Sequence, residues 1–306
     1  MTVLRLGTRG SKLAVAQSTA IAEAIRERLG RDVELVEIVT PGDRSSAPIQ
    51  QLGVGVFVSA LRDALVAKDI DLAVHSYKDL PTAQPDDLVI AAIPPRSDPR
   101  DALVARNGWT LNELPDDARI GTGAVRRIAQ LHALGRRLSP VPIRGNVDTR
   151  LRKVADGELD AVVLARAGLA RLGRAAEATE ILDPMLMLPA PAQGALAVEC
   201  RADGSGVAEL LAALDDETTR AAVAAERAML AELGAGCSAP IAALAEVAEG
   251  DEGLEIYLRG AVFSPDGTYA IRLSRTGTLA RAAEVGQMLA RDLRDEGADT
   301  VLGSTA

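Results

Sequence analysis

The sequence predicts an α/β protein of two lobes, followed by a small α+β domain. Three observations lead to this prediction. Apolar runs of strand length alternate with helically spaced apolar residues through the first two-thirds of the 306 residues. Proline-rich stretches at 94–99 and 188–192 interrupt the alternation, as expected where a chain crosses into a second lobe and returns. From Asp216 onward, a long helical pattern is followed by three strand-like runs.

The elements of the first lobe follow from apolar periodicity. Strands are predicted at 3–6, 33–39, 70–74 and 88–93, and helices at 12–29 and 57–67. Gly30 ends the first helix, because glycine readily adopts the left-handed conformation of a helix stop. Residues 40–55 hold Pro, Gly, Ser and Asp without periodicity, so they predict a long surface loop that is either functional or mobile.

The second lobe and the last domain are predicted in the same way. Strands of the second lobe are expected at 102–105, 119–121, 141–143 and 161–164, with helices at 125–134, 149–155 and 167–172. A strand at 196–198 follows the second crossing and belongs to the first lobe. The last domain has helices at 217–233 and 279–294 and strands at 241–247, 254–262 and 269–273. The domains are therefore 1–94 with 195–214, then 99–190, then 216–306.

Composition excludes several classes of protein. The net charge is −9, the isoelectric point is near 5.0 and aromatic residues make up 2%, which disfavours nucleic-acid binding. No apolar run reaches the roughly 18 residues of a membrane span, and no signal peptide is visible, so we expect a cytoplasmic protein. Two cysteines are too few for a disulfide framework. The chain has only two histidines and no close Cys/His pair, which disfavours a zinc site.

The basic residues are almost all arginine, and some of them stand in glycine-containing turns. Four of the 34 basic residues are lysine, which a biased genome composition also produces, and most arginines are expected on solvated helices. Arg9, Arg126, Arg127, Arg144 and Arg150 lie in or beside turns that follow predicted strands. An arginine in such a turn presents a planar, charged fork to a carboxylate or phosphate.

Each candidate segment also has a purely structural interpretation. His75-Ser76-Tyr77-Lys78-Asp79 is a catalytic acid with an anion anchor, or a polar strand end, and alone the second interpretation is favoured. Residues 121–127 form either an anion site at a helix N-terminus or a structural turn, and the sequence supports the two interpretations equally. They do not match a dinucleotide-binding fingerprint, because Arg126 stands where its third glycine would be. Residues 144–150 clamp carboxylates, or simply begin a helix with Asp148 as N-cap.

The two cysteines differ in their surroundings. Cys200 ends an apolar strand and is assigned to the core, whereas Cys237 lies in a Gly-Ala-Gly-Cys loop before Pro240. A lone cysteine is more often a small buried hydrophobe than a nucleophile. The glycines weaken that interpretation for Cys237, because they let a bulky group approach the sulfur closely.

Taken together, these segments resemble the porphobilinogen deaminase (hydroxymethylbilane synthase) family over nearly the whole chain. The order of the motifs makes the resemblance specific. They are Thr8-Arg9-x-Ser11, Gly55-x-Phe57, Val74-His75-Ser76-x-Lys78-Asp79, Asp98-Pro99-Arg100-Asp101, Gly121-Thr122 with Arg126-Arg127, Arg144-Gly145-Asn146-Val147 with Thr149-Arg150, residues 167–173, Gln193-Gly194, Ala225-Glu226-Arg227 and Gly236-Cys237.

The resemblance implies a fold, a cofactor and a reaction. The first two domains would be lobes of the type II periplasmic-binding-protein kind with the active site between them. The third would carry a dipyrromethane cofactor on a cysteine through a thioether. Four porphobilinogen units would be joined head to tail with release of ammonia, and water would free hydroxymethylbilane for uroporphyrinogen-III synthase. We expect a monomer that binds neither nucleic acid nor membrane.

The resemblance also implies roles for matching residues. Asp79 would be catalytic, stabilising the cationic azafulvene left by loss of ammonia, and is expected to be buried among arginines. Cofactor binding is expected from Cys237, Ser76, Lys78, Asp79, Thr122, Arg126, Arg127, Arg144 and Arg150. Substrate binding is expected from Arg9, Ser11, Phe57, Arg144, Arg150, Arg171 and Gln193. No metal ligand is expected.

The chain departs from the family pattern at a few positions. Val54 stands where the family often has a lysine, Gly123 and Ala124 replace serines, and Asp148 replaces a glycine. These departures predict altered affinity rather than loss of activity. The competing hypothesis is a two-lobed anion-binding module without chemistry, in which Asp79 and Cys237 are incidental. Under the enzyme hypothesis, Arg126→Leu or Arg144→Leu impairs ligand binding more than stability.

Overall fold

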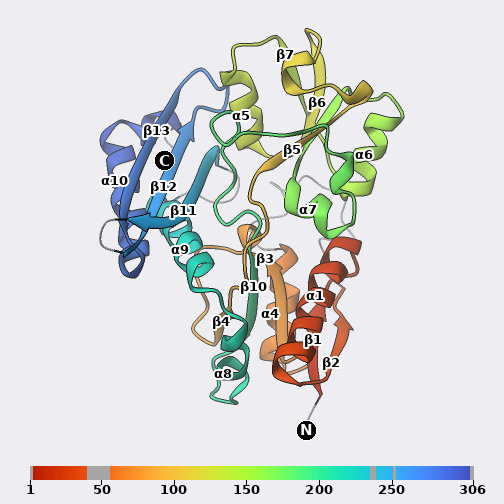
Figure 1. Ribbon diagram of the computed structural model, residues 1–306, viewed down its shortest axis with the longest axis vertical. Coiled ribbons are helices and arrows are strands. Elements are labelled where there is room, and N and C mark those ends of the chain that lie inside the picture. Colours follow the sequence, from red (N-terminus) through yellow and green to blue (C-terminus); the bar gives the residue numbers. More distant parts are fainter. Residues whose placement is uncertain (1–2, 40–55, 235–238, 251–252, 304–306) are drawn as a thin grey trace. The chain divides into compact units, whose positions relative to one another are not determined.

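The structure is a computed structural model that describes residues 3–39, 56–234, 239–250 and 253–303. Two compact units make up the chain: Met1–Arg96 with Ala195–Arg220, and Ser97–Gly194 with Ala221–Ala306 (Figure 1). The chain thus leaves the first unit within the first proline-rich stretch and returns just after the second. The loop predicted at 40–55 and the cysteine loop at 235–238 lie outside the described residues.

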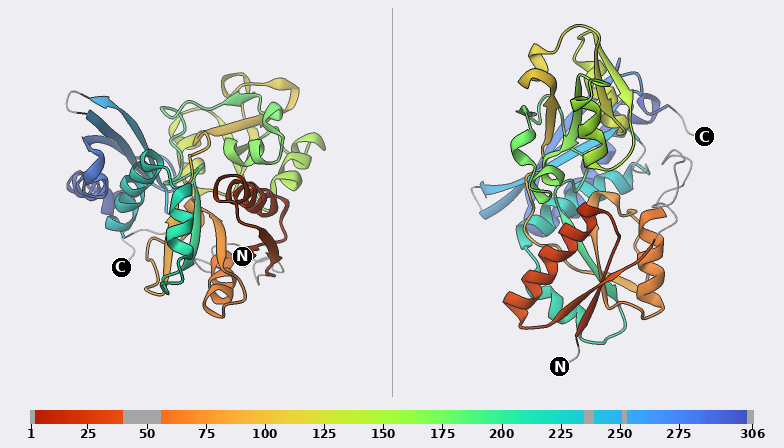
Figure 2. Two further views of the ribbon diagram at one scale, coloured as in Figure 1. Left: turned by 60° about the horizontal axis from the view of Figure 1, so that its bottom comes forward. Right: turned by 90° about the vertical axis from the view of Figure 1, so that its right-hand side faces the viewer.

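A five-stranded sheet forms the centre of the first unit. Its order is β2 (Val33–Glu37), β1 (Leu4–Thr8), β3 (Leu72–Ser76), β10 (Leu196–Arg201) and β4 (Leu88–Ala92), with β10 antiparallel to both neighbours. Successive residues of β3 enter different cores: Leu72 and Val74 pack with α1 (Lys12–Leu29), and Ala73 packs with α4 (Val56–Val66). The two helices therefore cover opposite faces of the sheet (Figure 2).

The second unit contains a sheet with the same plan. Its order is β7 (Leu138–Pro142), β6 (Ala118–Thr122), β8 (Ala161–Ala165), β5 (Asp101–Ala105) and β9 (Glu180–Ile181). Each sheet also contains one antiparallel strand that comes directly after the chain has entered from the other unit. This strand is β10 in the first sheet, where it pairs with β3, and β5 in the second, where it pairs with β8. α5 (Val125–Ala133) packs on one face, while α6 (Val147–Ala155) and α7 (Arg166–Arg171) pack on the other.

The C-terminal part of the chain is a three-stranded antiparallel sheet covered by helices. Its strands are β11 (Ile241–Gly250), β12 (Gly253–Phe263) and β13 (Ala270–Thr278). α9 (Glu217–Glu232), α10 (Ala282–Asp295) and α11 (Ala298–Val301) pack on it around a core of their own. A second apolar cluster joins Ala129 and Leu188 to Ala242, Leu244 and Phe263, which explains why this domain belongs to the second unit. The predicted fold class is confirmed.

Several predicted bounds were wrong by two to five residues, among them those of β3 and β13, and local signals explain some of the differences. α6 begins at Val147 rather than at residue 149, because Asn146, not Asp148, is its N-cap: the Asn146 side chain accepts the Thr149 N–H at 2.9 Å. β7 begins three residues before the predicted strand. β9 and the short helix α8 (Val207–Leu211) were not predicted, because two and five residues are too few to show periodicity.

A buried charged network lies inside the first unit, beneath α4. Glu199 on β10 has no exposed surface, and it accepts hydrogen bonds from Arg62 Nη2 at 2.8 Å and Gln84 Nε2 at 3.0 Å. His75 Nε2 lies 3.1 Å from its other carboxylate oxygen. Burial alone would raise the pKa of Glu199, but the interactions with His75 and Arg62 hold it at about 2.

This network predicts that the first unit loses stability in acid. Because the pKa of Glu199 is lower in the folded chain than in the unfolded one, its ion pairs stabilise the fold above about pH 4.5. That stability, of the order of 3 kcal/mol, is lost as the pH falls toward about 2. Urea unfolding at several pH values should show a shallower loss for Glu199→Gln than for the unchanged protein. Glu246→Gln, at an exposed glutamate, should keep the full loss, and equal pH profiles for all three proteins would contradict the assignment.

Candidate anion-binding and catalytic site

Two arginines predicted to bind an anion converge on one buried carboxylate. Asp101, at the start of β5, has no exposed surface, and Arg126 and Arg127, in the first turn of α5, are each 5% exposed. Arg126 Nη1 lies 2.8 Å from Asp101 Oδ2, and Arg127 Nη2 lies 2.7 Å from Oδ1. Although burial opposes ionisation, the two guanidiniums hold the pKa of Asp101 well below its usual range. One negative charge thus faces two positive charges.

Gln193 connects this cluster to both crossing segments. Its side chain is fully buried; the amide oxygen accepts from Arg126 Nη2 at 3.0 Å, and the amide nitrogen donates to Asp101 at 2.8 Å and to the Pro99 carbonyl at 2.7 Å. The next residue, Gly194, has φ +91, and a Cβ there would lie 2.4 Å from the Ser97 carbonyl oxygen. Only glycine therefore fits where the two crossing segments meet.

Further arginines of the second unit crowd toward the same region. Arg150 Nε donates to the Gly145 carbonyl at 2.9 Å. Burial, together with the positive charges of Arg127 and Arg144, lowers the pKa of Arg150 to about 10. A guanidinium whose pKa is lowered by other cations is in an unfavourable field, and an anion placed nearby would relieve it.

Arg171 is fixed at a different point of the same unit. Its Nη2 donates to the Gly194 carbonyl at 2.6 Å and to Ser97 Oγ at 3.3 Å, and burial lowers its pKa to about 10. Thr122, at the end of β6, is fully buried, and its hydroxyl accepts the Ala124 N–H at 3.3 Å. Both residues therefore shape the backbone turns that carry the site.

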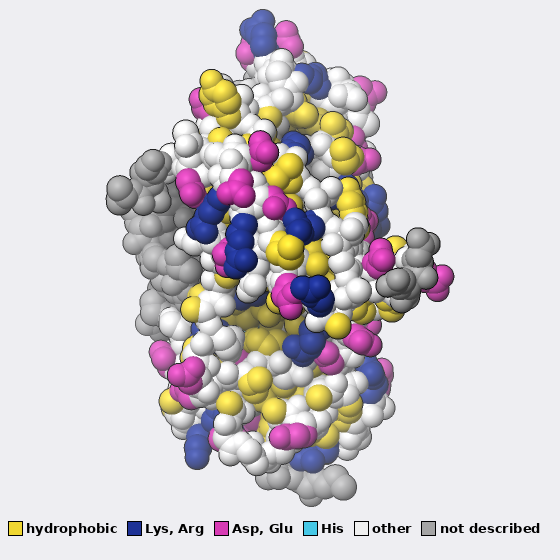
Figure 3. Space-filling model, turned by 90° about the vertical axis from the view of Figure 1, so that its left-hand side faces the viewer, with side chains coloured by type: hydrophobic (Ala, Val, Ile, Leu, Met, Phe, Trp, Pro, Cys, Tyr) yellow, Lys and Arg dark blue, Asp and Glu magenta, His cyan; other side chains and the backbone are white. Residues whose placement is uncertain are grey.

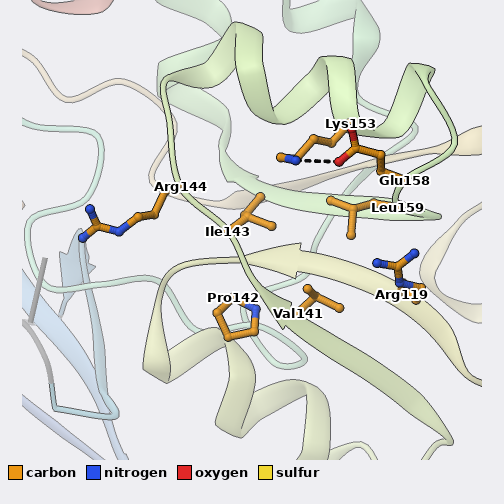
Figure 4. Close-up of a pocket in the computed structure, with 8 residues that line it drawn as sticks. All are labelled: Arg119, Val141, Pro142, Ile143, Arg144, Lys153, Glu158 and Leu159. Carbon is orange, nitrogen blue, oxygen red and sulfur yellow. Dashed lines mark hydrogen bonds and ion pairs between the residues drawn. The ribbon is translucent and has the colours of Figure 1, made fainter. Parts of the chain in front are cut away.

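A pocket of about 380 Å³ borders this region on the second unit (Figure 4). Arg144 and Arg119 lie at its two ends, and the apolar side chains of Val141, Ile143 and Leu159 lie between them. The Lys153–Glu158 ion pair (2.6 Å) also lines the pocket, so the lining includes a carboxylate as well as cationic and apolar side chains. Arg144, one of the residues predicted to bind cofactor and substrate, is thus placed at the edge of a cavity.

In the first unit the predicted site residues gather at the ends of β1 and β3. Ser11 is the N-cap of α1 and accepts the Ala14 N–H at 3.2 Å. Ser76 ends β3, where its hydroxyl accepts a hydrogen bond from Gln17 Nε2 at 2.9 Å. Gln17 is 5% exposed, so this bond fixes the Ser76 hydroxyl from inside the unit. Sequence reasoning did not identify Gln17.

Asp79 corrects one expectation. It lies on the 3-10 turn Tyr77–Asp79 that follows β3, and its side chain is exposed rather than buried. The reason is local, because the turn projects from the end of the sheet while Leu80, 1% exposed, anchors it in the core. Lys78 beside it is half-buried. An exposed carboxylate on an anchored turn is accessible to a ligand.

Three further predicted residues have less structural detail. Arg9 is half-buried after β1. Phe57 lies in the first turn of α4, and its side chain is outside the described part. Cys237 lies between α9 and β11 within residues 235–238 and is likewise outside it. Cys200, assigned to the core from sequence, is fully buried, and burial raises its pKa to about 11.

Three further features of the part of the chain that the structure describes concern its surface charge, its helices and its metal-ligating side chains. On the face shown in Figure 3, basic and acidic side chains are interspersed rather than gathered in a basic patch. Within the described ranges, each helix is too short or too polar to cross a bilayer. The same ranges contain no group of three or more His, Cys, Asp or Glu side chains that could hold a metal ion.

The family models and the similar sequences agree on one family. Residues 4–209 match the model "Porphobilinogen deaminase, dipyromethane cofactor binding domain", and residues 220–295 match "Porphobilinogen deaminase, C-terminal domain". A porphobilinogen deaminase of Nocardia farcinica is 60% identical over 310 residues, covering 100% of this chain and 89% of that relative. One from Mycobacterium marinum is 58% identical over 301 residues, covering 97% and 96%. Among solved structures, an ABC transporter periplasmic substrate-binding protein from Coxiella burnetii shares 13% identity, with a TM-score of 0.45 over 69% of this chain and 92% of that chain.

Proposed function

Because the chain belongs to the porphobilinogen deaminase family, we propose that it is a transferase that joins four porphobilinogen units head to tail, releasing ammonia each time, to give hydroxymethylbilane. The structural observation that carries this proposal is the pairing of two buried arginines, Arg126 and Arg127, with the single carboxylate of Asp101, which leaves an excess of positive charge. Each pyrrole unit brings an acetate and a propionate, so the growing chain supplies the negative charges that this excess favours. A charge-assisted pair contributes about 1.5–3 kcal/mol.

The described residues fit the dipyrromethane cofactor for which the family model is described. Arg126 and Arg127 outnumber the carboxylate of Asp101, and Arg150 is crowded by other cations, so the region favours added carboxylates. We assign direct contact with the cofactor side chains to Arg144 and Arg150, with Ser76 and Lys78 assisting, and covalent attachment to Cys237. For Arg126, Arg127 and Thr122, which are buried and already bonded within the protein, we propose that they support the cofactor site through their charge and by holding its turns. When bound, the cofactor supplies the terminal pyrrole to which the first substrate unit is joined.

Substrate carboxylates are assigned to the remaining polar groups. Arg9, Ser11 and Arg171, together with Arg144 and Arg150, are proposed to hold the acetate and propionate of porphobilinogen, and Phe57 to contact its ring. For Gln193 we propose support rather than direct contact, because both ends of its amide already bond to Arg126, Asp101 and Pro99. It would hold the Arg126 guanidinium in place.

Asp79 is proposed to act on charge and protons during condensation. When the aminomethyl carbon–nitrogen bond of porphobilinogen, with its amine protonated, breaks, neutral ammonia leaves and the ring carries the positive charge. A carboxylate beside the pyrrole N–H stabilises this charge. The carbon then bonds to the free ring position of the preceding unit, and the proton lost from that position restores aromaticity. Exposure of Asp79 at the end of β3 supports a role in direct contact with a ligand.

Two departures from the family pattern have structural explanations. A Cβ at Gly123 would lie 2.9 Å from the Ile143 carbonyl oxygen, so a serine would require the turn to shift. Asp148 Oδ1 accepts from Arg174 Nη1 at 2.6 Å, so an ion pair already compensates its extra negative charge. We propose that both changes adjust affinity without removing activity. Val54 lies outside the described residues.

The wider setting is also proposed from the family. We propose a cytoplasmic monomer whose product passes to uroporphyrinogen-III synthase, and a three-domain division at 1–94 with 195–214, 99–190 and 216–306. The packing of the C-terminal domain with Ala129 and Leu188 supports treating the last two domains as neighbours within one unit.

Intact mass tests the proposed function most directly. The denatured protein, expressed in a host that makes porphobilinogen, should exceed its sequence mass by one dipyrromethane, and Cys237→Ser should remove the excess. Cys200→Ser is the matched control and should keep it, because Cys200 is fully buried in the first unit. An unmodified protein that does not turn over porphobilinogen would reject the proposal. Calorimetric binding of small dicarboxylates without turnover would then favour an anion-binding module.

A further inference from the structure

Side chains from both flanks of the turn that carries Asp79 approach the Glu199 carboxylate. His75 is the second-last residue of β3 and precedes the turn Tyr77–Asp79, whereas Gln84 follows it on the way to β4. Gln84 Nε2 donates to this buried carboxylate at 3.0 Å, and His75 Nε2 lies 3.1 Å from its other oxygen. Gln84 Nε2 also donates to the Leu88 carbonyl at 3.3 Å, which ties this flank to the start of β4.

The turn itself rests on the strand that carries Glu199. Tyr77 N–H donates to the Ala195 carbonyl at 3.1 Å, and Leu80 N–H donates to the Tyr77 carbonyl at 3.2 Å. Leu80 packs with Val58 of α4 and Ala197 of β10. Residues 195–199 therefore support the turn through its backbone, its apolar anchor and both of its flanks.

The chemistry of the side chain matters as much as its place. All three groups that approach Glu199 (Arg62, His75 and Gln84) can donate, and an ionised carboxylate is the side chain that only accepts. A glutamine of the same size would present an NH₂ group to at least one donor. Two buried hydrogen-bond donors that face each other leave both without an acceptor, which lowers the stability of the fold around them.

We propose that Glu199 is a positioning residue. It fixes the turn that bears Asp79, because its carboxylate contacts both His75, which precedes the turn, and Gln84, which follows it. Arg62 extends this support to α4. Glu199 itself does not touch a ligand, because it has no exposed surface. The proposal rests on the proposed function only in taking Asp79 as the reacting group.

The test compares Glu199→Gln with Leu61→Ala, which removes a 2% exposed apolar side chain of α4 that takes no part in the hydrogen bonds to Glu199. Both variants are compared in holoenzyme whose cofactor loading has been verified by intact mass. We expect Glu199→Gln to lower kcat at least tenfold with KM within about threefold, because the acid is displaced while the arginines stay. Leu61→Ala should keep kcat near normal even where its unfolding midpoint falls further.

Hydrogen exchange gives a readout independent of turnover. Amides between residues 76 and 88 should exchange roughly tenfold faster in Glu199→Gln than in Leu61→Ala, at denaturant concentrations that equalise global stability. If Glu199→Gln does not fold, Gln84→Ala offers a second test, because Gln84 is exposed and its substitution removes only one of the contacts to Glu199. It should still lower kcat severalfold and speed amide exchange between residues 76 and 88. Unchanged kcat and exchange, or equal effects in Leu61→Ala, would overturn the positioning role. Absence of turnover in the unsubstituted protein would instead reject the proposed function.

Discussion

Asp79→Asn is expected to keep the fold and to lower porphobilinogen turnover by roughly 10²–10⁴-fold, the range of a positioned acid–base group. Asp79 is exposed on a 3-10 turn that Leu80 anchors in the core, so removal of its charge leaves the packing of the turn unchanged. A surface substitution of this kind usually changes stability by less than about 0.5 kcal/mol. The loss should appear in kcat, because asparagine keeps the shape but not the negative charge that balances the cationic substrate.

The comparison for Asp79→Asn needs a neighbouring acid without the proposed role. Asp87→Asn serves, since Asp87 is exposed and precedes β4 in the same unit. Initial rates would be measured on cofactor-loaded protein, with circular dichroism and urea unfolding as checks of the fold. Near-normal turnover in Asp79→Asn, or an equal loss in Asp87→Asn, would show that Asp79 is not the reacting group.

The elements of the fold were predictable where a local rule decides them. Apolar spacing and Gly30 define α1, whose last residue is Leu29 as predicted. The start of α6 was misplaced because both Asn146 and Asp148 are good N-caps in sequence, and only the backbone decides which one accepts the Thr149 N–H. Elements of two or five residues, such as β9 and α8, carry no periodic signal.

The site was predictable as a set of residues but not as a set of contacts. Arg126 and Arg127 stood out beside their glycine turn, yet their partner Asp101 lies 25 and 26 residues earlier in the chain. Strand pairing across the sheet creates that contact, and it has no local sequence signal. The same limit applies to Gln17 and Ser76, which are 59 residues apart. Burial of Asp79 was wrongly predicted because the ligand chemistry suggested enclosure, whereas the turn projects from its strand.

Arg126→Leu and Arg150→Leu should both impair cofactor loading, but with opposite consequences for stability. Arg126 is 5% exposed and donates to Asp101, Gln193 and the Leu188 carbonyl, so its loss leaves buried acceptors unpaired. Breaking a buried ion pair costs about 3–5 kcal/mol, a large part of a typical folding free energy. The sequence led us to expect that Arg126→Leu would affect ligand binding more than stability. From the structure we instead expect a large loss of folding stability as well.

Arg150 stands in the opposite situation. Its pKa is lowered by burial and by Arg127 and Arg144, and the hydrogen bond that it donates, to the Gly145 carbonyl, contributes about 0.5–1.5 kcal/mol. A leucine removes one member of a crowded set of cations, so the free energy of unfolding should stay within about 1 kcal/mol of the starting value or rise. The residue would thus be retained for its ligand rather than for the fold.

Urea unfolding in a Cys237→Ser background separates the two arginines, because a protein that cannot attach its cofactor gains no stability from binding it. In that background Arg126→Leu should lower the unfolding midpoint strongly and Arg150→Leu should not. With Cys237 restored, intact mass should show reduced loading for Arg150→Leu despite its intact fold. If Arg150→Leu instead unfolds as readily as Arg126→Leu, the crowded arginines are structural, and the carboxylates of the pyrrole chain must be bound elsewhere.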